Sequence, residues 1–253
     1  MVSSPSSILI TGASSGIGEA LALAYARPGA FLALSGRNAE RLASVAAAAQ
    51  ARGAAVETAA IDVVERAALA AWINAVDAAH PLDLVVANAG ISNGTSGSDD
   101  PAEQTRRIFA INIDGVVNTV EPVIPLMRAR KRGQIALMAS LAALLGAAQA
   151  PAYCASKAAV KIWSDGLRAL LAQDGIAVSV IMPGFVESRM TAANPRPKPG
   201  MISAARAAQI IVRQLAANRA RIAFPLWFYW VVRTAAALPP DVLAWITRKV
   251  AQS

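Results

Sequence analysis

The chain contains one histidine, His80, and one cysteine, Cys154, among its 253 residues. A lone histidine excludes a Ser-His-Asp triad and any multi-histidine metal site, so no metal is expected. A lone cysteine excludes an intrachain disulfide, which fits a reducing compartment and a cytoplasmic location. We interpret Cys154 as a small packing residue rather than a nucleophile. No apolar run reaches the roughly 20 residues of a membrane span, and residues 1–7 lack the features of a signal peptide.

Acidic residues are scarce in the C-terminal quarter. Residues 186–253 hold 10 Lys and Arg against 2 Asp and Glu, whereas residues 1–100 hold 5 against 9. No recognition-helix pattern or basic–aromatic groove accompanies the excess, so nucleic acid is not expected as a partner. An anionic substrate or an anionic membrane surface fits this charge, and so does a merely solvated basic face.

Short β-rich apolar runs alternate with longer, Ala-rich amphipathic runs. This alternation indicates βαβ units and a parallel sheet with helices on both faces, a doubly wound Rossmann-type α/β fold. No linker divides residues 1–253, so we predict a single domain with an apolar, basic C-terminal helical extension over residues 222–253. Strands are expected at residues 7–11, 31–35, 55–61, 84–87, 134–139, 177–182 and 221–224. Helices are expected at residues 17–27, 38–52, 65–79, 101–131, 152–173 and 203–217.

A glycine-rich turn follows the first expected strand. Glycine lets backbone approach a pyrophosphate closely, and a helix that begins near Gly16 directs free N–H groups and a positive dipole end at phosphate. Glycine spacing alone also fits a tight turn without ligand, but the position between strand and helix favours a phosphate site. The residues expected to bind there are Gly12, Ser14, Ser15, Gly16, Ile17 and Gly18.

The end of the second strand predicts which dinucleotide binds. An acidic residue there binds the ribose 2′-hydroxyl of NAD, but no Asp or Glu occurs between Glu19 and Glu40. Gly36 leaves space for a 2′-phosphate, and Arg37 can pair with it bidentately, although Arg37 could also be a solvated residue opening the next helix. We therefore predict NADP(H).

Tyr153 and Lys157 are four residues apart in an expected helix, which places both on one face. An ammonium there favours the phenolate, lowers the Tyr153 pKa and can reach the nicotinamide ribose. Ser140 ends a strand and can hydrogen-bond a reacting carbonyl oxygen, and Asn112 lies in the expected helix 101–131.

Together with the phosphate loop, these residues resemble the short-chain dehydrogenase/reductase family. The matching segments occur in the family's order over about residues 7–190. They are Thr11–Gly18, Asp62-Val63, Asn88-Ala89-Gly90, Asn112, Ser140, Tyr153-x-x-x-Lys157 and Pro183-Gly184.

The resemblance implies roles for these residues. Ser140 would polarise the substrate oxygen, Tyr153 would transfer the proton, Lys157 would tune Tyr153, and Asn112 would hold a water that links Lys157 to solvent. Asp62 and Val63 would border the adenine. The groove would be lined by Asn88, Ala89 and Gly90, and the nicotinamide end would be contacted by Pro183, Gly184 and Val186.

The chain departs from the family pattern in two places. Ser188 stands where the family usually has threonine, so a hydroxyl remains to contact the carboxamide. The C-terminus lacks the Gly-Gly-containing final strand that many tetrameric members use, which favours a homodimer through helices near residues 105–130 and 152–173 over the usual tetramer.

The residues after Ser140 predict an apolar substrate. Residues 141–148 have no charge and no side-chain hydrogen-bond donor, which fits either a ligand pocket or a subunit contact. Residues 188–203 are expected to form a lid with Gly200 as hinge. The chain is thus predicted to interconvert a hydrophobic, lipid-like carbonyl compound and its alcohol. The alternative is a regulator that senses NADP(H) without catalysis.

The apolar run 222–232 contains five of the chain's aromatic residues. Its first part is expected to be the last strand. The aromatics then pack on the substrate pocket or a partner subunit, or make peripheral contact with a membrane, whose interface suits Trp and Tyr. The run is too short to cross a bilayer.

Overall fold

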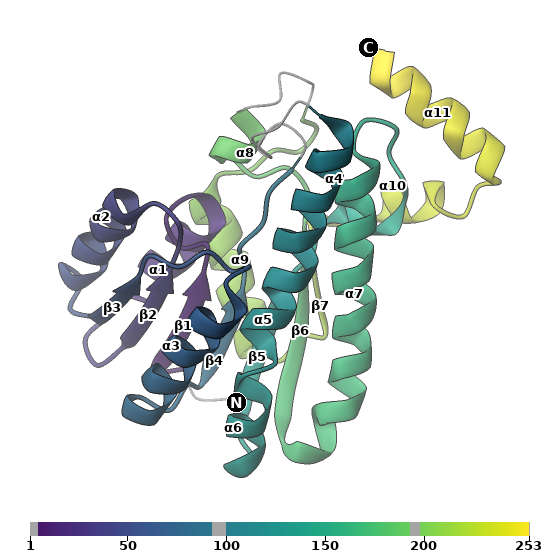
Figure 1. Ribbon diagram of the computed structural model, residues 1–253. Helices are drawn as coiled ribbons and strands as arrows, with labels where there is room; N and C mark the ends of the chain where they lie inside the picture. The colour runs from purple at the N-terminus through teal and green to yellow at the C-terminus, as the bar shows by residue number, and fades with distance from the viewer. Residues whose placement is uncertain (1–4, 93–99, 193–197, 253) are drawn as a thin grey trace.

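The computed structural model describes residues 5–92, 100–192 and 198–252, drawn in colour in Figure 1. Seven strands form one sheet in the order β3-β2-β1-β4-β5-β6-β7, and every pair is parallel. The expected doubly wound α/β fold is confirmed. The strands are β1 (Ser7–Thr11), β2 (Phe31–Ser35), β3 (Ala55–Ala59), β4 (Leu84–Ala87), β5 (Gly133–Met138), β6 (Ile176–Pro183) and β7 (Arg221–Phe224).

Helices cover both faces of the sheet (Figure 1). On one face, α1 (Gly16–Tyr25), α2 (Ala39–Gln50) and α9 (Ala204–Ala216) bury their apolar sides against the strands. On the other face lie α3 (Arg66–Ala79), α5 (Gly115–Val120), α6 (Val123–Ala129) and α7 (Pro151–Leu171). β4 is buried along its whole length because it is covered from both sides, which explains why its sequence lacks polar alternation.

The chain order reverses between β1 and β4, which are neighbours in the sheet. The connections from these strands leave toward opposite faces, and a ligand-binding crevice is expected at the carboxyl ends of strands at such a point. The expected phosphate loop follows β1, and Asn88 follows β4, so both lie at this crevice.

The single helix expected over residues 101–131 was wrong. The segment consists of α4 (Pro101–Phe109), a π-helical turn η2 (Ala110–Asp114), α5 and α6. In the π turn the Gly115 N–H bonds the carbonyl oxygen of Ala110, five residues back. A residue pattern cannot easily show such a turn, because it adds one residue without breaking the apolar periodicity.

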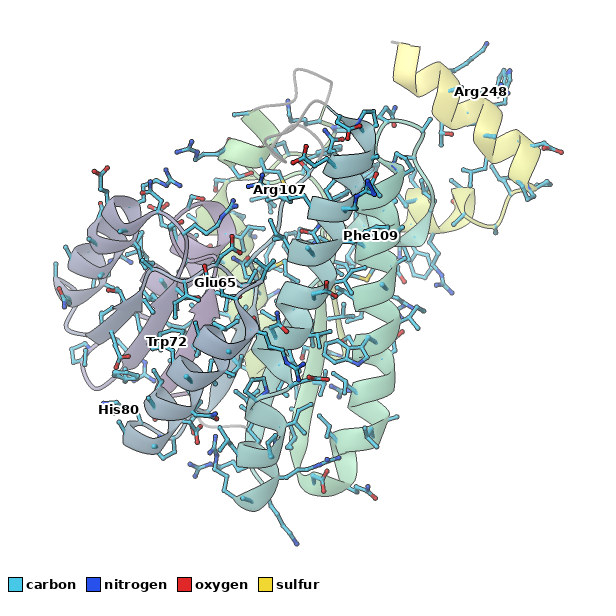
Figure 2. All side chains as sticks on the ribbon, in the orientation of Figure 1. Glu65, Trp72, His80, Arg107, Phe109 and Arg248 are labelled. Atoms are coloured by element: carbon cyan, nitrogen blue, oxygen red, sulfur yellow. The ribbon has the colours of Figure 1, made fainter. Side chains whose placement is uncertain are left out.

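The C-terminal run is a strand followed by helices. β7 ends at Phe224, and α10 (Leu226–Ala235) and α11 (Pro240–Gln252) follow. α11 stands away from the rest of the molecule, and Arg248 projects from it (Figures 1 and 2). Within the described ranges, no helix combines the length and apolarity needed to cross a membrane.

Candidate active site

The loop between β1 and α1 is shaped by glycine. Gly12 and Gly16 have φ of 67° and 60°, in the left-handed region that favours glycine. A Cβ on Gly18 would lie 2.3 Å from the carbonyl oxygen of Gly12, so the helix and the turn can approach this closely only without a side chain. Ser15 precedes α1 but its side chain does not cap the first-turn N–H groups. The residues present therefore fit a diphosphate at the start of α1.

The ends of β1 and β4 are joined by side-chain hydrogen bonds. Thr11 Oγ1 accepts from the backbone N–H groups of Asn88 (3.2 Å) and Ala89 (3.3 Å). Asn88 Nδ2 donates to the carbonyl oxygens of Thr11 (2.9 Å) and Gly12 (3.2 Å). These bonds fix the floor of the crevice beneath the loop. The sequence reasoning gave Thr11 no role, although its position as the last residue of a strand was a signal.

Polar groups gather where β2 and β3 end. A Cβ on Gly36 would lie 3.1 Å from Ser14 Oγ, so this glycine keeps space beside the loop. The half-exposed Arg37 guanidinium lies 3.8 Å from the Asp62 carboxylate. Val63 is buried, and its carbonyl oxygen accepts from Asn118 Nδ2 at 2.9 Å. The structure thus brings the residues predicted for the adenosine end to one place.

Tyr153, Lys157 and Ser140 meet at the carboxyl end of β5. Tyr153 and Lys157 both lie on α7, and Lys157 Nζ is 5.8 Å from the centre of the Tyr153 ring. Ser140 precedes the short 3-10 helix η3 (Leu141–Leu144), and its hydroxyl lies close enough to the Tyr153 side chain to lower the pKa of that phenol. Ser140 Oγ also donates to the Pro183 carbonyl oxygen at 3.3 Å. A substrate oxygen placed at the two hydroxyls would face both a donor and a proton carrier.

Asn112 lies in the π turn and is fully buried. Its side chain accepts from the backbone N–H of Ile91 (2.8 Å) and donates to the Ile91 carbonyl oxygen (2.9 Å) and Ser156 Oγ (3.0 Å). Ser156 Oγ in turn donates to the Tyr153 carbonyl oxygen at 2.8 Å. Asn112 therefore ties the segment after β4 to the helix that carries Tyr153. Ser156 was missed, although it lies between Tyr153 and Lys157 in the sequence.

Burial dominates the ionisation of the two central groups. Burial lowers the pKa of Lys157 to about 8, and its Nζ donates to the Met138 carbonyl oxygen at 2.9 Å. Burial also raises the pKa of Tyr153, and the nearby Ser140 hydroxyl opposes this shift. The sequence predicted that Lys157 lowers the Tyr153 pKa. In the protein alone the shift is upward, because loss of hydration outweighs every favourable contact.

The predicted nicotinamide-end residues follow β6. Val186 pairs with Ile202 in an isolated parallel bridge, which ties the two ends of the expected lid together. Ser188 lies beside the phosphate loop, because a Cβ on Gly16 would be 3.2 Å from Ser188 Cβ. Its hydroxyl lies 3.2 Å from that of Thr191 in α8 (Arg189–Ala192). The middle of the expected lid, residues 193–197, lies outside the described residues.

α10 adds residues that the sequence did not assign to the site. α10 packs against η3, and a Cβ on Gly184 would lie 3.3 Å from the Phe228 ring. Phe228 stacks with Phe185 at 6.0 Å between ring centres. The sequence alone could not indicate that Phe228 lies near the site, because this depends on the strand ending at Phe224 and a helix beginning after it.

The crevice, the glycine loop and the Ser-Tyr-Lys group define an oxidoreductase with a dinucleotide-binding fold. The chain belongs to the short-chain dehydrogenase family, whose sequence profile, described as short chain dehydrogenase, matches residues 6–198.

Relatives agree with this assignment. An uncharacterized oxidoreductase from Myxococcus xanthus is 39% identical over 232 residues, which cover 91% of this chain and 92% of that protein. A ketoacyl reductase, HetN, from Nostoc is 35% identical over 181 residues, covering 71% and 63%.

Two solved structures share the fold. A short-chain dehydrogenase from Sphingobium yanoikuyae in complex with NADPH has a TM-score of 0.78 and 26% identity, and the match covers 87% of this chain and 88% of that one. A short-chain dehydrogenase from Mycobacterium paratuberculosis bound to NAD has a TM-score of 0.75 and 25% identity, covering 86% and 94%.

Proposed function

We propose that the protein is an NADP(H)-dependent reductase of hydrophobic ketones or aldehydes, reversible as an alcohol dehydrogenase. The observation that carries this proposal is the meeting of Ser140, Tyr153 and Lys157 beside the crevice that the glycine loop opens. The similarity to a ketoacyl reductase supports carbonyl chemistry.

The cofactor choice depends on the adenosine end. Arg37 and Ser14 offer a guanidinium and a hydroxyl beside Gly36, a set that suits a 2′-phosphate. The phosphate loop would hold the diphosphate, Asp62 and Val63 would border the adenine, and Asn88, Ala89 and Gly90 would line the groove. Pro183, Gly184, Val186 and Ser188 would contact the nicotinamide, which when bound supplies or accepts the hydride.

Ser140 and Tyr153 would act on the substrate oxygen. Ser140 donates a hydrogen bond to the carbonyl oxygen, and Tyr153 delivers its hydroxyl proton as that oxygen gains charge. The Lys157 ammonium stabilises the phenolate that remains, which offsets the burial that raises the Tyr153 pKa. In the oxidative direction the phenolate takes the alcohol proton.

Gly90 supports the relay proposed for Asn112. A Cβ on Gly90 would lie 3.2 Å from both Asn112 Oδ1 and Lys157 Nζ, so the two atoms flank the space that this glycine leaves. The second lone pair of Oδ1 could accept from a water there. After the Lys157 ammonium passes a proton to the Tyr153 phenolate to restore the phenol, that water would replace the proton on Lys157 from solvent.

The Tyr153→Phe variant tests the catalytic role. It should bind NADPH as tightly as the unaltered protein but lose turnover by roughly 10²–10⁴-fold, because the proton donor is gone. NADPH absorbance with carbonyl compounds of graded chain length measures turnover. Undiminished activity would overturn the mechanism, and tight NADPH binding without turnover of any carbonyl by the unaltered protein would favour a cofactor-sensing regulator.

The Arg37→Ala variant tests the cofactor. It should raise the Kd for NADPH roughly 10–100-fold, as expected from losing a charged hydrogen-bond partner worth about 1.5–3 kcal/mol, and leave the Kd for NADH nearly unchanged. Arg66→Ala removes an exposed arginine of α3 and serves as the matched control. Equal losses for both cofactors would show that Arg37 does not read the 2′-phosphate.

A further inference from the structure

The outer face of α10 is apolar and uncovered. Leu226 (65%), Trp227 (54%), Trp230 (57%) and Val231 (53%) are all more than half exposed. Their spacing places them on one side of the helix. Large apolar side chains that gather on one exposed surface indicate a partner.

The inner face of α10 is already occupied, so this helix cannot turn its aromatics inward. Tyr229 is buried, and its hydroxyl accepts from Arg221 at 3.1 Å. Phe228 is packed against the main core beside Gly184. A Cβ on Gly200 would lie 2.8 Å from the Trp227 ring, so one edge of that ring rests on backbone while the rest of it faces outward. These contacts therefore hold the exposed apolar residues of α10, here called the strip, toward solvent.

α11 continues the apolar surface away from the body. Val242 and Trp245 are exposed on it, and Leu238 is exposed in the turn before it. Figure 2 shows that Arg248 projects from α11 away from the rest of the molecule. The two helices thus extend one apolar, partly basic surface beyond the domain.

Two exposed tryptophans of these helices, Trp230 and Trp245, each lie beside a cationic side chain. The Arg233 guanidinium lies 6.0 Å from the centre of the Trp230 ring, and Lys249 Nζ lies 4.5 Å from that of Trp245. Residues 226–252 contain three basic residues and only Asp241 as an acid. Indole rings and adjacent cations together match the boundary between acyl chains and anionic headgroups.

We infer that α10 and α11 bind the surface of an anionic lipid bilayer. A second copy of the chain is disfavoured as the occupant, because two such faces would bring Arg233, Arg248 and Lys249 of each copy together with few acids to pair them. Anionic headgroups neutralise these cations instead. Because α10 also adjoins η3 and Gly184, the bound surface lies next to the candidate active site.

Co-sedimentation with vesicles tests the inference and does not depend on the proposed reaction. The protein should sediment with vesicles of phosphatidylcholine and phosphatidylglycerol and much less with phosphatidylcholine alone. Trp227→Ala/Trp230→Ala should lower the partition coefficient by about tenfold or more, since it removes both interfacial indoles of α10. Arg248→Gln/Lys249→Gln should weaken binding to anionic vesicles only.

Ile162→Ala/Leu170→Ala is the matched control, because it removes two apolar side chains that are exposed on a single chain but lie on α7, outside the proposed lipid-binding helices. This control should bind vesicles as the unaltered protein does. NADPH binding by each variant shows that the domain is folded, independently of any turnover. Absence of sedimentation with either vesicle at low salt would overturn the inference. An unchanged partition coefficient of the tryptophan variant would also overturn it. A change in the molecular mass of this variant by light scattering, without any change in lipid binding, would instead show that the apolar face of α10 binds a second copy.

Discussion

Lys157 is a buried cation whose position is set by one backbone carbonyl. Its side chain is 3% exposed, and Nζ donates to the Met138 carbonyl oxygen. Within the described residues it forms no ion pair with a carboxylate. An unpaired buried ammonium costs free energy, which is consistent with a group retained for chemistry rather than for stability.

The Lys157→Met variant should make the cofactor-free protein more stable and inactive. Lys157 has a pKa of about 8 in the folded protein and near 10.4 when unfolded, so the folded state binds the proton less well. The buried Lys157 charge destabilises the folded protein to its full extent below about pH 8, and this effect disappears above about pH 10.4. The variant should therefore raise the unfolding midpoint at pH 7 by roughly 6–12 °C, the effect of about 3 kcal/mol in a chain of this size. This gain should shrink as the pH rises from 8 to 10.4.

Thermal unfolding followed by circular dichroism at several pH values measures this difference. Lys161→Met is the control, because Lys161 lies on the same helix but pairs with Asp165 at 2.8 Å. A Lys157 variant that unfolds at a lower temperature at pH 7 would show that the bond to Met138 outweighs the burial of the charge.

At the level of whole elements, the sequence predicted the regular strands and helices but missed the irregular turns within the segment 101–131. Each of the seven strands was predicted to within two residues, because buried parallel strands are short β-rich runs between helical patterns. The glycine loop and the Tyr153–Lys157 pair depend on local spacing, so both could be placed on their elements without a structure. The π turn at Asn112 and the break after Val120 could not, since neither interrupts the apolar pattern of residues 101–131.

Contacts between elements that are distant in the sequence could not be predicted either. Thr11 joins β1 to the segment after β4, and Ser156 joins α7 to Asn112. Phe228 reaches Gly184 because α10 turns back over η3 after Pro225. Each depends on sheet order or on the direction in which a helix leaves the sheet, which a residue pattern does not encode directly.

At the scale of the whole molecule, the described residues include two uncovered apolar surfaces that lie on different elements. One is the strip on α10 and α11. The other follows α7, where the exposed residues recur at helical spacing and are mostly small. They are Ala155, Ala159, Ile162, Gly166, Ala169 and Leu170. Small residues allow two helices to approach closely, and α4 packs beside α7 to broaden the surface, with Phe109 partly exposed on it (Figure 2).

We propose that the α7 surface joins two copies in a homodimer. Unlike the strip on α10 and α11, it carries few cations on its exposed line, so two copies can meet face to face with little repulsion. The Ile162→Lys/Leu170→Lys variant should dissociate the dimer, because four ammonium groups would then be buried at one interface. Light scattering after size exclusion should give about twice 26.1 kDa for the unaltered protein and 26.1 kDa for the variant. Val242→Lys places the same charge on α11 and should leave the dimer intact while weakening vesicle binding. A monomeric unaltered protein would overturn the proposed dimer. A Val242 variant that dissociates while the α7 variant stays dimeric would assign the dimer interface to the C-terminal helices instead.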